Sequence, residues 1–189
     1  GRSRKNRCKP VSNKGGSKRM LIQTGIPSAE DILTVTPSEE RFAKGPVAIA
    51  ECFQKIPCNP CTMACAKKAS RVEPDINQTP RVDFDVCNGC GVCLTRCPGL
   101  AIFIVDKTYS DTEALIKLPF EFLPLPKEGQ LACGLNRAGE EMGWFPVVKV
   151  IPGSKTNKTC TICLAVPKDL AMEVEISEQE VIRMDDKNT

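Results

Sequence analysis

The run from Cys87 to Pro98 limits what this chain can fold into more than any other feature. It reads Cys-Asn-Gly-Cys-Gly-Val-Cys-Leu-Thr-Arg-Cys-Pro, which is the spacing Cys-x2-Cys-x2-Cys-x3-Cys-Pro. Three thiolates two residues apart on a tight loop can reach three corners of a cubane, while the fourth is directed elsewhere. Gly89 and Gly91 suit such a loop, because glycine tolerates positive φ values and lets backbone amides approach sulfur. The run therefore predicts thiolate ligands of a [4Fe-4S] cluster.

A second group of cysteines about thirty residues upstream repeats part of this spacing. Its last three cysteines are Cys58, Cys61 and Cys65, spaced like the last three cysteines of the later run. Lys55 stands where the later run has its first cysteine, and the nearest thiol is Cys52. We interpret this as a three-residue expansion of the loop that leaves Cys52 as the displaced first ligand.

Over residues 47–106 the two runs resemble the bacterial-type ferredoxins with two [4Fe-4S] clusters. In that family the last cysteine of each run ligates the cluster of the other run. The resemblance implies a first cluster held by Cys52, Cys58, Cys61 and Cys97. It implies a second cluster held by Cys87, Cys90, Cys93 and Cys65. It also implies that the chain transfers electrons.

Two other uses of cysteine fit the pattern less well. Structural zinc favours two Cys-x2-Cys knuckles or cysteines combined with histidine, whereas this chain has no histidine and eight thiols in two runs. Disulfide frameworks are typical of short secreted domains, and we find no apolar signal segment at the start of this chain. We therefore expect free thiolates, two iron-sulfur clusters and a reducing, cytoplasmic setting.

Composition bounds the remaining organisation. The 189 residues are 41% hydrophobic and leave room for a core and at most two small domains. No run of apolar residues is long enough to span a membrane, so we expect no span. Residues 1–20 carry 8 of the 26 Lys and Arg residues and no Asp or Glu. Residues 21–189 therefore have 18 basic against 23 acidic residues, a net charge of −5. We expect residues 1–20 to be disordered or ordered by a partner, and the acidic remainder argues against a nucleic-acid partner.

Turn, cap and alternation signals predict an α+β protein. A helix should begin after Ser28, and a second should have Thr36 as its cap, Pro37 at its first position and Glu39 reaching back to the cap. Strands and hairpin arms are expected at 47–50, 71–76, 81–86, 101–106, 113–118, 130–135, 143–151, 158–166 and 174–176, with a brief helix at 167–172. The predicted segments are a basic arm at 1–20, short N-terminal helices at 21–46, a two-cluster ferredoxin-like domain at 47–106, a small antiparallel β module at 107–184 and a tail at 185–189.

Four cysteines lie outside the two runs. Cys160 and Cys163 form a Cys-x2-Cys that Cys133 and Cys8 could complete as a metal knuckle. In an extended strand, however, residues 160 and 163 point to opposite faces. We interpret these cysteines as small apolar residues of a sheet.

The chain lacks the usual signatures of a catalyst. It has no Gly-x-Gly-x-x-Gly after a strand, no phosphate-binding loop and no histidine to act as a general base. Residues 48–61, together with the β-rich remainder, are similar to ferredoxin-type subunits of FAD-dependent amino-acid or imino-acid dehydrogenases of anaerobic bacteria, of the sarcosine or proline dehydrogenase kind. This resemblance implies a hetero-oligomer in which a flavoprotein subunit binds FAD and catalyses, while this chain passes electrons to an external acceptor.

Two rival functions stay open at this point. The metal could stabilise a structural or interaction module without redox activity. Alternatively, the chain could be the iron-sulfur domain of a nucleic-acid enzyme, which the acidity of residues 21–189 disfavours.

Overall fold

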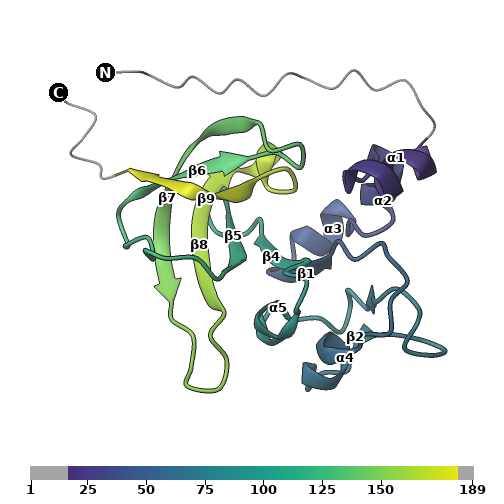
Figure 1. Cartoon of the computed structure of the whole chain (residues 1–189). Coiled ribbons are helices and arrows are strands. Elements are labelled where there is room, and N and C mark those ends of the chain that lie inside the picture. The colour runs from purple at the N-terminus through teal and green to yellow at the C-terminus, as the bar shows by residue number, and fades with distance from the viewer. Residues whose placement is uncertain (1–16, 183–189) are drawn as a thin grey trace.

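One seven-stranded antiparallel sheet organises the protein. The computed structural model describes the backbone from residue 17 to residue 182 and the side chains from residue 21 to residue 174. The strands of the sheet follow the order β1-β4-β5-β8-β7-β6-β9, and β2 pairs with β3 in a separate two-stranded ribbon. Figure 1 shows the short helices gathered beside the β1 edge, away from the long strands β7 and β8.

The elements have the following bounds. The helices are α1 (Ser17–Thr24), α2 (Ala29–Leu33), α3 (Glu39–Phe42), α4 (Pro60–Ala64), α5 (Val92–Arg96) and the 3-10 helix η1 (Lys168–Leu170). The strands are β1 (Val47–Ala50), β2 (Ser70–Arg71), β3 (Arg81–Val82), β4 (Ile102–Asp106), β5 (Glu113–Phe120), β6 (Leu131–Leu135), β7 (Glu141–Ile151), β8 (Cys160–Pro167) and β9 (Glu175–Ile182).

Strand β1 separates two apolar cores. Its alternate residues Val47 and Ile49 face the large core between the sheet and α3. The intervening residues Ala48 and Ala50 face a smaller core that also contains Cys61 and Cys93. Because alanines leave room that larger side chains would fill, this face of β1 keeps space beside the cysteine runs.

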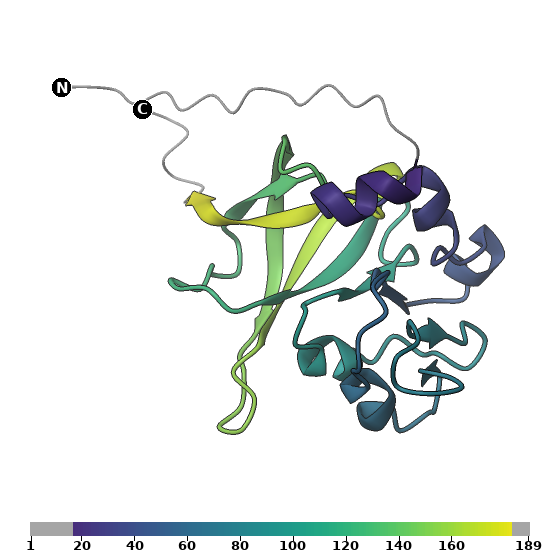
Figure 2. The same ribbon diagram turned by 45° about the vertical axis from the view of Figure 1, so that its right-hand side comes forward.

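Strand β4, which pairs with β1, also contributes residues to both cores. Ile102 and Ile104 belong to the smaller core, whereas Val105 belongs to the large one. β1 and β4 pair over their whole common length, from Val47 opposite Val105 to Ala50 opposite Ile102. The cysteine runs therefore pack on two strands of the main sheet, and the turned view in Figure 2 shows them on one side of it.

The two predicted N-terminal helices form, but one predicted cap is wrong. Ser28 caps α2 as predicted, through reciprocal hydrogen bonds with Asp31. Thr36 does not cap α3, since its hydroxyl donates back to the carbonyl of Ile32. Ser38 is the cap instead, accepting a hydrogen bond from the Arg41 amide. The helix begins two residues later than predicted, because Ser38 offers a cap hydroxyl two residues after Thr36.

Several predicted boundaries differ from the observed ones. The boundary predicted between residues 106 and 107 falls inside the main sheet, because β4 pairs with β5. The predicted hairpin between 71–76 and 81–86 has only two pairs of residues. The last strand is longer than the predicted 174–176, and residues 17–20 of the predicted arm form the first turn of α1. Residues 1–16, which include Cys8, and the predicted tail at 185–189 lie outside the described residues.

Candidate metal centres

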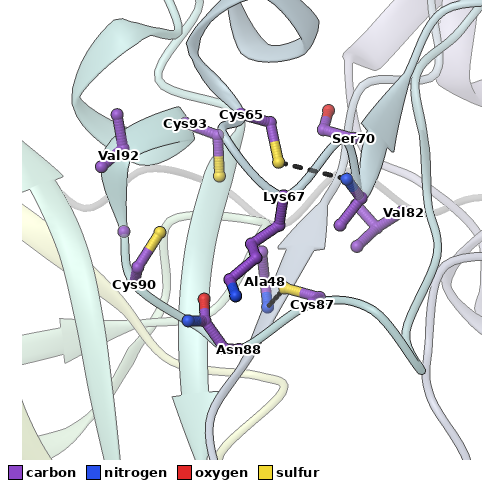
Figure 3. A pocket seen from close by; sticks show the side chains of 12 residues that line it. Ala48, Cys65, Lys67, Ser70, Val82, Cys87, Asn88, Cys90, Val92 and Cys93 are labelled. Carbon is purple, nitrogen blue, oxygen red and sulfur yellow. Dashed lines mark hydrogen bonds between the residues drawn. The ribbon is translucent and has the colours of Figure 1, made fainter.

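Four cysteines from both runs surround one pocket. Cys65 comes from the earlier run, and Cys87, Cys90 and Cys93 come from the later one. Figure 3 shows their four sulfur atoms directed toward the same hollow. This is the grouping that the resemblance implied for the second cluster.

Local backbone geometry sets the positions of these sulfurs. Gly89 and Gly91 have φ values of 62° and 85°, which only glycine adopts without strain. Gly91 directly precedes α5, so Cys93 lies in the first turn of that helix and is buried. Cys65 ends α4 in an extended conformation, which turns it out of the helix toward the later run.

A second pocket gathers the other four cysteines of the two runs. Its lining contains Cys52, Cys58, Cys61 and Cys97. Cys97 ends α5 in an extended conformation, as Cys65 ends α4. The expanded loop from residue 52 to residue 58 still brings Cys52 to the pocket. All eight cysteines thus lie where the predicted crossed arrangement needs them, and their binding of iron remains a prediction.

Backbone amides donate hydrogen bonds to three of these sulfurs. The amides of Ala48 and Ala69 donate to Sγ of Cys87 and of Cys65 at 3.4 and 3.2 Å. The amide of Ala101 donates to Sγ of Cys97 at 3.4 Å. Such bonds favour negative charge on sulfur, so each pocket is prepared for thiolates.

The pKa values of the thiols show the same competition between burial and stabilisation. Burial raises the pKa of Cys93 to about 12, with the neighbouring Cys87, Cys90 and Cys65 adding to the shift. Burial followed by the charges of neighbouring thiols also raises the pKa of Cys52. Burial acts in the same direction on Cys65, but four backbone amides outweigh it and lower that pKa. Closely spaced buried thiols favour a metal that holds them all deprotonated.

Each pocket has four thiols around it, as a [4Fe-4S] cluster requires. A cubane places its four thiolates on four separate irons and so needs them around a cavity. The buried hydroxyl of Ser70 lines the Cys87 pocket, and its Oγ has no partner among the described residues.

Three cysteines outside the two runs are buried in the sheet. Cys133 lies on β6, and Cys160 and Cys163 lie on β8. None of them lines either cysteine pocket. Every described cysteine is free of a disulfide.

The sequence analysis missed three polar residues around the Cys87 pocket. Ser70 and Lys67 line it, and Arg41 donates a hydrogen bond to the carbonyl of Cys87. Ser70 and Lys67 follow Cys65 by only a few residues in the sequence, so their position near this cysteine could have been predicted. Arg41 lies 46 residues before Cys87, and no local pattern connects the two.

Substituting Gly89 should empty the Cys87 pocket. A Cβ at Gly89 would lie 2.5 Å from Cβ and 2.6 Å from the carbonyl carbon of Pro46, in addition to the strain of its positive φ. We expect Gly89→Ala to lose about half of the iron, because the loop cannot keep its cysteines in place. Iron and acid-labile sulfide assays measure this loss. Gly99→Ala is the control, since its Cβ meets nothing within 4 Å, and equal iron in both variants would contradict the expectation.

The comparisons with known proteins agree with this chemistry. The family model described as a 4Fe-4S binding domain matches residues 80–103. The ferredoxin-type protein NapF of Haemophilus influenzae is 39% identical over 56 residues, which cover 29% of this chain and 32% of that relative. The match therefore spans only about a third of the relative. No solved structure matches the chain. These findings identify a ferredoxin-like [4Fe-4S] segment and support an iron-sulfur electron-transfer role.

Proposed function

We propose that this chain carries two [4Fe-4S] clusters and relays electrons from a flavoprotein dehydrogenase subunit to an external acceptor. The observation that carries the two-cluster proposal is the sorting of eight cysteines into two pockets of four. Each pocket combines three cysteines of one run with the last cysteine of the other. A [4Fe-4S] cluster supplies one-electron transfer when bound.

The chain's own residues prepare this role. The two pockets share the small core of β1, β4, α4 and α5, because Ala48 and Ile102 line different pockets on adjacent strands. Cys90 of the Cys87 pocket is exposed, whereas Cys52, Cys58 and Cys97 of the other pocket are partly buried. An electron would pass between the two pockets through the shared core.

The partner proposal rests on the resemblance of residues 48–61 and of the β-rich remainder to dehydrogenase subunits. The sheet from β5 to β9 supplies no cysteine to either pocket. Such an extension is available for contact with another subunit. FAD would then lie on that partner, which would catalyse the oxidation and release electrons in pairs.

Iron stoichiometry tests the two-cluster proposal. Two complete sites predict about eight iron and about eight sulfide per chain after anaerobic purification. Reversible bleaching of the visible absorbance by dithionite should accompany this content. A value near four iron would show that the Cys52 pocket is incomplete, and full iron without reduction would favour a structural module.

Affinity purification from the native host tests the partner proposal separately. The tagged chain should recover a flavin-containing subunit, detected by its absorbance and by mass spectrometry of the co-purified protein. Recovery of a lone monomer that reacts fully with soluble acceptors would reject the partner while leaving the cluster proposal intact.

A further inference from the structure

We infer that Arg41 makes the cluster that the Cys87 pocket would hold the one with the higher reduction potential, so that electrons would collect there. The inference rests on the two-cluster function proposed above and adds the direction of electron flow. With clusters bound by the two groups of cysteines, one electron from the proposed flavoprotein would pass from the Cys52 site to the Cys87 site and leave to a one-electron acceptor.

Arg41 places a buried positive charge directly beside the Cys87 loop. The residue is 8% exposed and lies on α3, outside both cysteine runs. Its Nη2 donates to the carbonyl of Cys87 at 2.6 Å and to that of Pro46 at 3.1 Å. Its Nη1 donates to the carbonyl of Gly45 at 3.0 Å, and its Nε donates to the carbonyl of Phe84. The guanidinium thus fixes the loop before Cys87 and the chain entering β1.

No carboxylate of the described residues lies within 4.0 Å of this guanidinium, since all its polar partners are backbone carbonyls. The hollow beside it contains Asp85 and Lys44, so one acid and one further cation lie nearby. The charge of Arg41 is therefore held by carbonyl dipoles and is not paired with a carboxylate among the described residues. Because it is shielded from water, it acts on the neighbouring cluster more strongly than an exposed cation would.

The two pockets differ in their polar surroundings. The Cys87 pocket has Lys67 at its lining and the buried Arg41 in an adjoining hollow that Cys87 also lines. The Cys52 pocket has no Lys or Arg among its lining residues, and the cation that shares an adjoining hollow with Cys52, Arg81, is exposed to water. Reduction adds negative charge to a cluster, and nearby positive charge and hydrogen bonds stabilise that charge. The Cys87 cluster should therefore accept an electron at the higher potential.

The test is an anaerobic redox titration followed by electron paramagnetic resonance. The Cys58→Ser and Cys90→Ser variants, each keeping one cluster, assign the two reduction steps. As the potential is lowered, the Cys87 cluster of the wild-type protein should be reduced before the Cys52 cluster. We expect Arg41→Gln to lower the reduced-to-oxidised ratio of this cluster about tenfold at a fixed potential, which is about 59 mV for one electron. The reduction potential of the Cys52 cluster should change much less in this variant.

Lys44→Gln is the matched control, because it removes the same charge from an exposed position nearby. Screening by water and salt should keep its effect below about threefold. Arg41→Lys keeps the positive charge but loses the planar guanidinium, so the reduction potential of the Cys87 cluster should stay close to the wild-type value. If Arg41→Gln fails to keep its cluster, the order in which the two clusters of the wild-type protein are reduced decides.

Separate outcomes overturn the inference and the proposed function. Two clusters with the Cys52 cluster reduced first, or equal shifts in Arg41→Gln and Lys44→Gln, would refute the inference alone. Iron near four per chain would refute the two-cluster function. In that case the effect of Arg41 on the remaining Cys87 cluster would still be measured.

Discussion

Replacing Cys97 with serine should remove the cluster of the earlier cysteine run, although Cys97 belongs to the later one. Cys97 lines the pocket of Cys52, Cys58 and Cys61 and receives the Ala101 amide there. We expect Cys97→Ser to lose about four of about eight irons, and Cys65→Ser to lose the other four. Iron and sulfide assays on anaerobically purified variants measure both losses.

Double variants show which cysteines share a cluster without any spectroscopic assignment. Cys97→Ser combined with Cys58→Ser should lose no more iron than Cys97→Ser alone, because both would serve one cluster. Cys97→Ser combined with Cys93→Ser should lose nearly all iron. The opposite pattern would mean that each run keeps its own cluster. Cys133→Ser is the control, since Cys133 is buried in β6 away from both pockets and should leave the iron content unchanged.

The spacing of the cysteines within each run could be read from the sequence, whereas the crossed grouping of Cys65 and Cys97 came only from the resemblance to two-cluster ferredoxins. A thiol three residues after another on a tight loop reaches the same cavity, and the terminal Cys65 and Cys97 each end a short helix in an extended turn. Alternation also located most strands, since the sheet exposes one face of several strands and buries the other. The spacing within a run and the alternation along a strand are local signals, and they need no knowledge of the tertiary fold.

The polar residues behind the cysteines could not be predicted in this way. Arg41 reaches the Cys87 carbonyl from 46 residues upstream, and Arg137 reaches Glu51 from 86 residues downstream. Only the folded sheet brings these pairs together. The domain boundary predicted at residue 106 falls inside the main sheet for the same reason, because local sequence does not show that β4 pairs with β5. The exchange of Thr36 for Ser38 as a cap was a choice between two equally suitable local signals.

An ion pair joins the Cys52 loop to the far side of the sheet. Arg137, in the turn between β6 and β7, donates from Nε and Nη2 to the two carboxylate oxygens of Glu51 at 2.8 and 2.6 Å. Its Nη1 donates to Glu173 at 2.8 Å, and its Nη2 also donates to the carbonyl of Met172. The side chains of Arg137 and Glu51 are only 11% and 10% exposed. Because Glu51 directly precedes Cys52, this pair fixes the start of the expanded loop.

Breaking this pair from one side should be costly. Arg137→Met would leave the Glu51 carboxylate buried without its partner, which typically destabilises a protein by about 3–5 kcal/mol. We expect the variant to unfold at clearly lower denaturant, followed by far-ultraviolet circular dichroism, and to lose the Cys52 cluster before the Cys87 cluster. Arg71→Met is the matched control, since its pair with Asp83 spans 3.8 Å and is 48% and 38% exposed. Exposed pairs contribute only about 0–1 kcal/mol, so this control should unfold nearly like the wild type.

The double variant Arg137→Met with Glu51→Gln separates the buried charge from the lost contacts. Most of the instability of Arg137→Met comes from an unpaired buried carboxylate, so neutralising that carboxylate should recover a large part of the stability. Recovery of stability without recovery of the Cys52 cluster would show that the fork of Arg137 also positions the loop. Equal destabilisation in the single and double variants would contradict the buried-charge explanation. The fold would then depend on the contacts of Arg137 with Met172 and Glu173, and the charge of Glu51 would be incidental.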